Sequence, residues 1–263
     1  MLVEPPRAEP TGSGAGRRWL VGGAIVWAVA LVGAGYLSAR NSPPTVREQR
    51  SVAQAAPIVD RAAGELVAAA GPDAVLEISR RRLSTGCRLT AARDGVTLER
   101  SVSIRTAEAD GPAMVDRLTE RLPAGYGARA RHSGAIHQLR ADAGEFVAIS
   151  GGVLAPGVVT LTVSSGCRPP STDLVAEAEP TGRPVDAVPL RVLTGLGAAG
   201  VERLPGTSVP CPGGGAAETA RAAGRRASGT AGRQAVQAYR SESTAVIVRA
   251  DGDTITVAAT TGC

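Results

Sequence analysis

The first strong pattern along the chain is an unbroken apolar run near its start. Residues 19–37 carry no charged side chain. Nineteen helical residues at about 1.5 Å each span roughly 28 Å, close to the hydrocarbon thickness of a bilayer. Trp19 and Tyr36 lie at the two ends of the run, where aromatic rings favour the membrane interface. The run therefore predicts one transmembrane helix at residues 19–38.

Two uses of this helix agree with the sequence. A retained anchor leaves residues 1–18 as a cytoplasmic tail and puts the rest of the chain outside the membrane. A signal peptide would instead be cleaved near Gly35 or Ala39, and the protein would be secreted. The run is longer than an ordinary signal core, so we favour the anchor. The arginines that flank the run are nearly balanced and fix its orientation only weakly.

Beyond the run, alternation of apolar and small polar residues predicts strands in two stretches that resemble each other. Residues 158–167 and 254–263 align without a gap, and both end in two hydroxyl residues, a glycine and a cysteine. A period of two is the pattern of a half-buried strand. We interpret the similarity as an internal duplication; chance similarity of two strand ends is the alternative.

Helical periodicity and turn signals extend this match to other elements. Helices are expected at 57–70 and 190–199, before the first cysteine of each half, and at 112–122 and 216–227 in the middle of each half. Further strands are expected at 129–139, 146–153, 234–239 and 245–250. A hairpin over 83–104, which turns at Asp94-Gly95 and puts Cys87 opposite Val102, is interpreted as an insertion in the first half.

Together these elements predict an α+β protein. One N-terminal transmembrane helix precedes two small repeated units, each with helices packed on an antiparallel sheet and one disulfide. The expected boundaries are a polar stalk at 39–54, a first extracytoplasmic unit at 55–168, a proline-rich linker at 169–188 and a second extracytoplasmic unit at 189–263.

Four cysteines, all beyond the apolar run, indicate the compartment. An even number on one side of a membrane span predicts an oxidising environment, because disulfides persist outside the cytoplasm. None has the Cys-x-x-Cys spacing of zinc or thioredoxin-like sites. Three pairings are open, with buried free thiols as the alternative. The duplication favours one bridge within each half: Cys87–Cys167 and Cys211–Cys263.

Composition excludes several functions. Six aromatic residues in 263 cannot form a stacking platform for single-stranded nucleic acid, so we expect no nucleic-acid partner. The cores must be built from Ala, Val, Leu and Ile. The two histidines, His132 and His137, are five residues apart in a predicted strand. They are therefore expected on opposite faces, unable to chelate one metal ion together.

Candidate sites are consequently few. No Gly-x-Ser-x-Gly, His-Glu-x-x-His or phosphate-loop pattern occurs, so no catalytic, cofactor or metal residue is assigned. The net charge is +5, and all 29 basic residues are arginine. Arginine suits carboxylates and phosphates; a solvated surface is the alternative. The candidate anion-binding residues are Arg80, Arg81 and Arg82, which precede Cys87, and Arg129 and Arg131, which share one strand face.

The lysine-free composition is similar to that of high-GC actinobacterial proteins. Residues 209–215, before an Ala/Arg-rich stretch, and the final Thr-Thr-Gly-Cys resemble uncharacterised exported, membrane-anchored or lipoprotein-like proteins of that group. The resemblance covers about the last sixty residues and implies export and disulfides, but no activity. The chain departs from it because no lipidated cysteine follows the apolar run.

Three functional hypotheses follow. The first is a non-enzymatic binding or structural module at the cell envelope, with an envelope protein or an anionic envelope polymer as partner. The second is an extracytoplasmic enzyme whose site is assembled only in the fold, which an Asp–His pair in a cleft would favour. The third is an accessory subunit that packs on a membrane complex through small residues of the apolar run.

Overall fold

The computed structural model describes residues 14–41, 50–174, 184–226 and 235–263. The chain forms two compact units: residues 1–44 with 90–93, and residues 45–89 with 94–263. Most of the predicted cytoplasmic tail (1–18), and parts of the predicted stalk (39–54) and linker (169–188), lie outside the described residues.

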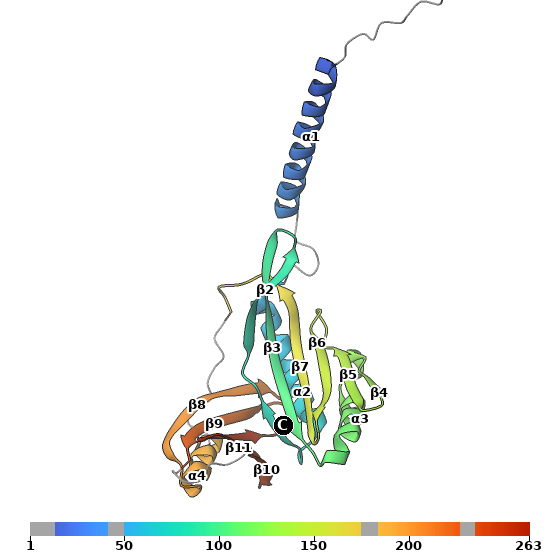
Figure 1. Ribbon diagram of the computed structural model, residues 1–263. Coiled ribbons are helices and arrows are strands. Elements are labelled where there is room, and N and C mark those ends of the chain that lie inside the picture. The colour runs from blue at the N-terminus through green and yellow to red at the C-terminus, as the bar shows by residue number, and fades with distance from the viewer. Residues whose placement is uncertain (1–13, 42–49, 175–183, 227–234) are drawn as a thin grey trace, which may run out of the picture. The chain divides into compact units, whose positions relative to one another are not determined.

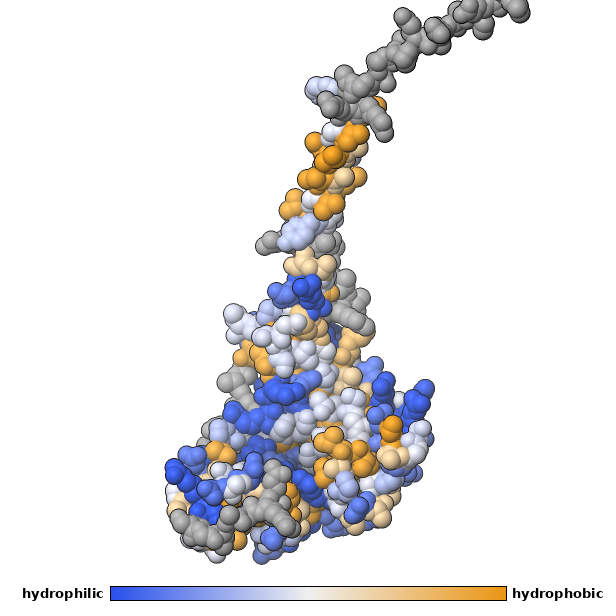
Figure 2. Space-filling view, viewed as in Figure 1, coloured by the Kyte–Doolittle hydropathy of each residue, from blue (hydrophilic) through white to orange (hydrophobic). Residues whose placement is uncertain are grey.

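The predicted apolar helix is confirmed. Helix α1 (Gly14–Asn41) contains a 20-residue apolar stretch, Trp19–Ser38, that is long enough to cross a membrane, and none of that stretch is buried. Figure 2 shows the apolar side chains of this helix in orange. Its length and composition are those of a membrane-spanning helix or of a signal sequence.

The remaining chain is α+β, with two antiparallel sheets (Figure 1). The first sheet has the strand order β1-β3-β7-β6-β5-β4, and β2 also pairs with β3. Its strands are β1 (Val75–Ile78), β2 (Arg82–Thr90), β3 (Arg93–Arg105), β4 (Arg129–Ser133), β5 (Ile136–Asp142), β6 (Ala148–Ala155) and β7 (Val158–Arg168). Its helices are α2 (Val52–Ala70) and α3 (Gly111–Arg121), with short 3-10 turns η1 (Glu108–Asp110) and η2 (Ala124–Tyr126).

Helix α2 begins within the stretch predicted as a stalk. The hydroxyl of Ser51 accepts a hydrogen bond from the Gln54 backbone, and the Gln54 side chain accepts one from the Ser51 backbone. This capping box fixes the first turn. The apolar face of α2 then packs on β7 and α3. The buried hydrophobic residues are Ala, Val, Leu, Ile and one Met, as the composition predicts.

The second sheet has the order β10-β11-β12-β9-β8. Its strands are β8 (Ala199–Pro210), β9 (Ala216–Arg225), β10 (Ala235–Ser241), β11 (Thr244–Asp251) and β12 (Thr254–Thr261). Helix α4 (Ala187–Gly195), which follows the short turn η3 (Pro184–Asp186), packs on β8, β9 and β12. A separate small core, centred on Leu193, Val246 and Val257, lies between the helix and the sheet.

The helix predicted at 216–227 is wrong, because residues 216–225 form strand β9. Gly214 and Gly215 both have positive φ and turn the chain back after β8. Strand β9 then lies between β8 and β12 and pairs with both. Alanine favours a helix by only a fraction of a kcal/mol, and tertiary context overrides that preference. Small side chains suit a strand that is covered on both faces.

The hairpin turn predicted at Asp94-Gly95 is also wrong. The turn is at Ala91-Ala92, where the Thr90 hydroxyl accepts a hydrogen bond from the Ala92 backbone. Val102 pairs with Ile78 and Leu161, so it does not face Cys87 as predicted. The element-by-element match of the two halves fails as well, since α3 has no counterpart among the described residues of the second sheet.

The two sheets meet at strand β1. The Ile78 backbone donates to the hydroxyl of Thr219 on β9 at 3.2 Å. Glu77 forms ion pairs with Arg221 at 2.9 Å and with Arg249. Burial alone would raise the pKa of Glu77, but the two guanidinium groups hold it below its ordinary value. A mostly buried carboxylate therefore joins the two sheets.

This arrangement predicts a pH dependence of stability. Because the pKa of Glu77 is lowered on folding, its stabilising contribution is complete above the ordinary value of 4.5. The contribution is lost as the pH falls through the folded-state pKa. We expect Glu77→Gln to be less stable than wild type at neutral pH and to converge with it in acid, as measured by urea unfolding. A constant difference at all pH values would contradict this role.

Candidate functional site

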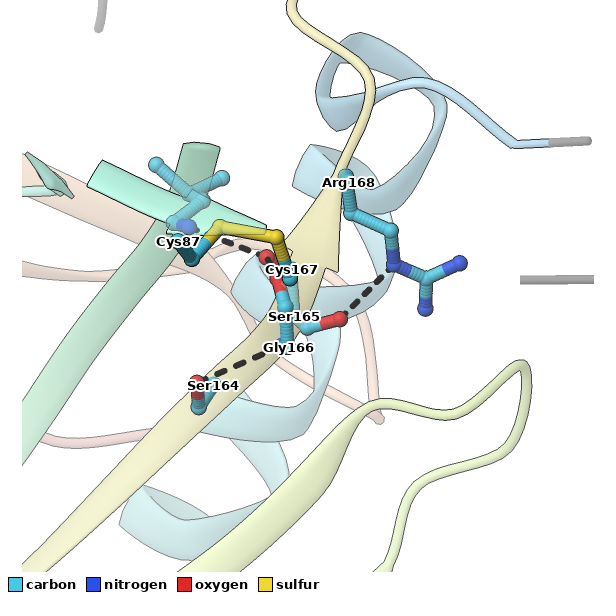
Figure 3. The surroundings of a disulfide bond; sticks show 7 residues. Cys87, Ser164, Ser165, Gly166, Cys167 and Arg168 are labelled. Carbon is cyan, nitrogen blue, oxygen red and sulfur yellow. Dashed lines mark hydrogen bonds between the residues drawn. A yellow bond between two sulfur atoms is a disulfide. The ribbon is translucent and has the colours of Figure 1, made fainter. Parts of the chain in front are cut away.

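The two disulfides have the predicted pairing, Cys87–Cys167 and Cys211–Cys263. The first joins β2 to β7, as Figure 3 shows. Gly95 lies beside this bridge, and a Cβ atom there would come within 2.5 Å of the Cys167 sulfur. Gly95 therefore leaves room for the disulfide. This explains why position 95 is a glycine although it is not part of the hairpin turn. One bridge lies in each sheet region.

The neighbouring arginine is structural. The side chain of Arg168 is buried, and its Nε donates to the carbonyl oxygen of Ser165 at 2.7 Å. A second guanidinium nitrogen donates to the carbonyl oxygen of Glu145. Figure 3 shows Arg168 extending away from the disulfide toward the loop before β6. Arg168 thus fixes backbone carbonyls.

The predicted cluster Arg80-Arg81-Arg82 does not converge on one site. Arg81 forms an ion pair with Asp60 on α2. Arg82 forms an exposed ion pair with Glu99 at 2.7 Å. Arg80, which lies in the sequence between the end of β1 and Arg81, has an exposed side chain. The guanidinium groups of Arg81 and Arg82 are therefore already bound to carboxylates of the same chain.

Arg129 and Arg131, in contrast, lie in a group of arginines without carboxylate partners. Both are exposed on β4, and Arg129 pairs directly with Arg140 across the hairpin. Like charges in directly opposite positions destabilise a sheet. None of the three side chains forms an ion pair or a side-chain hydrogen bond within the described residues. A bound anion would remove this repulsion.

These arginines continue a polar surface that crosses five strands of the first sheet. Cross-strand partners point to the same face, and α2 lies on the opposite face, behind β3 and β7 in Figure 1. Two hydroxyl pairs mark this face: Ser101–Thr162 at 3.0 Å and Ser103–Thr160 at 3.1 Å. We call it the polar face. Its two rows are Ser101-Thr162-Ser150-Arg140-Arg129 and Ser103-Thr160-Gly152-Gln138-Arg131.

The arginine end of the polar face is hollowed. A cavity of about 690 Å³ is lined by the three arginines, Gln138 and Tyr126, and Asp142 is its one carboxylate. Partial burial raises the pKa of Tyr126, so its phenol remains a neutral hydroxyl at physiological pH. In Figure 2, hydrophilic side chains lie at the edge of the molecule near β4 and β5, beside hydrophobic ones. The cavity therefore combines positive charge with neutral polar groups.

The two histidines are not on opposite faces, as predicted from one continuous strand. The chain turns at Gly134-Ala135, so His132 on β4 and His137 on β5 are direct cross-strand partners. Their Nδ1 atoms are 2.7 Å apart. The Ser-Gly step at 133–134 is a turn signal, and recognising it would have divided the predicted strand 129–139 correctly.

No protein-family model matches the chain, and no curated protein matches it. Within the described ranges, no group of three or more His, Cys, Asp or Glu side chains is placed to hold a metal ion. Together, the apolar helix and the two disulfides indicate an extracytoplasmic protein.

Proposed function

We propose that the chain is a single-pass membrane protein of the cell envelope. Its N-terminus is cytoplasmic, α1 is the retained anchor, and the two sheets form a non-enzymatic binding module outside the membrane. The length of the apolar stretch in α1 and the two disulfides support this topology. We include in this proposal that the chain belongs to the exported actinobacterial proteins that residues 205–263 resemble. The lysine-free composition supports this assignment.

The ligand that the polar face fits best is an anionic envelope polysaccharide. Five strands at about 4.8 Å spacing give a surface of roughly 19 Å, the width of several sugar residues. Serine and threonine hydroxyls can exchange hydrogen bonds with sugar hydroxyls, and guanidinium groups pair with carboxylate or phosphate oxygens. The observation that carries the proposal is that Arg129 and Arg140 are direct cross-strand neighbours and that neither forms an ion pair with a carboxylate in the described part of the chain.

An enzymatic role has one observation in its favour, the Asp116–His132 pair at 2.8 Å. This pair is exposed, with 38% of the His132 side chain and 51% of the Asp116 side chain accessible. The second ring nitrogen of His132 faces another histidine, whereas a general base would face a nucleophile. These features favour a binding module.

The proposal also retains the duplication. The strand order β2-β3-β7-β6-β5 corresponds to β8-β9-β12-β11-β10, and in each set the first cysteine belongs to the first strand or its end. On this correspondence, the hairpin β2–β3 matches β8–β9, and the inserted elements of the first half are β1, α3 and β4.

Binding can be tested with the full-length chain in detergent. We expect fluorescein-labelled dextran sulfate to bind, and the combined variant Arg129→Gln/Arg131→Gln/Arg140→Gln to bind at least about tenfold more weakly. Exposed ion pairs contribute up to about 1 kcal/mol each, and 1.4 kcal/mol is tenfold in affinity. Fluorescence anisotropy measures both.

A matched control removes the same charge elsewhere. Arg88, Arg191 and Arg203 are exposed and form no ion pair within the described part of the chain. Replacing these three by glutamine should change the affinity little. Equal weakening by both triple variants would mean that net charge alone governs binding, and equal binding of uncharged dextran would exclude recognition of the anion.

A further inference from the structure

The hairpin β4–β5 carries a second constellation, on the face opposite the arginines. His132 and His137 project from neighbouring strands, and their Nδ1 atoms are 2.7 Å apart. The ring centroids are 5.0 Å apart, with a 52° angle between the ring planes. The two nitrogens therefore lie within hydrogen-bonding distance of each other, and the rings are tilted and not stacked.

Asp116, on α3, orients the first ring. Its carboxylate lies 2.8 Å from Nε2 of His132. A carboxylate accepts hydrogen bonds, so Nε2 carries the proton and Nδ1 of neutral His132 presents a lone pair to His137. A histidine that donates its other ring N–H to a carboxylate is the usual arrangement around protein-bound metals, because it fixes the tautomer and raises the basicity of the ligand nitrogen.

We propose that His132 and His137 bind one divalent late transition-metal ion through their Nδ1 atoms, with Asp116 as a positioning residue. When the metal binds, neutral His137 transfers its proton from Nδ1 to Nε2 through solvent, and water completes the coordination. No electron transfer is involved. This ligand set of two imidazoles and water is smaller than the all-protein cages of structural zinc sites.

The geometry favours copper(II). With nitrogen–metal distances of about 2.0 Å, adjacent ligands of a square-planar centre are about 2.8 Å apart, whereas tetrahedral ligands are about 3.3 Å apart. The observed separation is 2.7 Å, which is closer to the square-planar value, so the rings need mainly to turn their lone pairs toward a common point beside the line that joins the two nitrogens. Copper(II) also binds nitrogen ligands more tightly than the other divalent metals of its row.

The test uses the full-length chain in detergent, without a histidine tag. The chain contains only two histidines, so every imidazole signal must come from this pair. We expect one equivalent of Cu(II) to bind and pulsed electron paramagnetic resonance to detect two coordinated imidazoles. A wild-type spectrum with one imidazole, or with none, would overturn the proposal without reference to any variant.

Variants separate the ligands from the positioning residue. His132→Gln and His137→Gln should each abolish the two-imidazole signal, and unchanged copper affinity in either variant would overturn the site. Asp116→Asn should weaken affinity about tenfold and retain both imidazole couplings; unchanged affinity would exclude its positioning role. Copper should raise the thermal midpoint of wild type but of neither histidine variant, and equal midpoints without metal show that the variants fold.

Discussion

Replacing Asp60 with alanine should lower the free energy of unfolding by about 3 to 5 kcal/mol. The side chain of Arg100 is completely buried in the first sheet. Its Nη1 lies 3.4 Å from the Asp60 carboxylate and donates to the carbonyl oxygen of Ser208 at 2.9 Å. Asp60 also binds Arg81. Without Asp60, the buried Arg100 guanidinium loses the carboxylate that lies 3.4 Å from its Nη1. Urea unfolding followed by circular dichroism measures the loss.

Two controls identify the cause. The double variant Asp60→Ala/Arg100→Met removes both buried charges and should recover much of the lost stability. The variant Glu99→Gln breaks the exposed pair with Arg82 and should cost less than about 1 kcal/mol. If the double variant is no more stable than Asp60→Ala, the penalty comes from lost packing and not from the unbalanced charge.

Removing either disulfide should cost about 4 kcal/mol in the chain-entropy model. The bridges close loops with sequence separations of 80 and 52 residues. The variants are Cys87→Ala/Cys167→Ala and Cys211→Ala/Cys263→Ala, measured by urea unfolding without reductant. The loops do not overlap in sequence and belong to different sheets, so the two losses should add. The variant without any cysteine should then be largely unfolded.

Reduction provides the control. A thiol reductant should destabilise wild type as strongly as the four substitutions together and should leave the cysteine-free variant unchanged. A loss below about 1 kcal/mol for either pair, or a product in which a cysteine of one sheet is bridged to the other sheet, would contradict the described pairing.

Much of the fold follows from periodicity and spacing. Patterns that extend over several turns or pairs made the apolar run, the strands β7 and β12, and the helices α2, α3 and α4 predictable. The disulfide pairing followed from the similarity of the two halves. The segment that became β9 was not predictable from composition, because β8 and β12 on either side of it decide its conformation.

The candidate sites were only partly predictable. Arg129 and Arg131 were identified from alternation, but their partner Arg140 was missed, because the hairpin that brings it opposite Arg129 was interpreted as one strand. The same error separated His132 from His137. For Arg81, only the fold shows that its guanidinium binds Asp60 of α2, since that contact joins residues 21 positions apart.

The uneven distribution of aromatic residues has a practical consequence. Both tryptophans of the chain, Trp19 and Trp27, belong to the apolar stretch of α1, and both are exposed. Their intrinsic fluorescence therefore does not report unfolding of the sheets. It responds to the lipid surroundings of a single helix. A mature form processed near Gly35 or Ala39 would contain no indole ring, so emission excited near 295 nm distinguishes the tethered protein from a secreted one without any label.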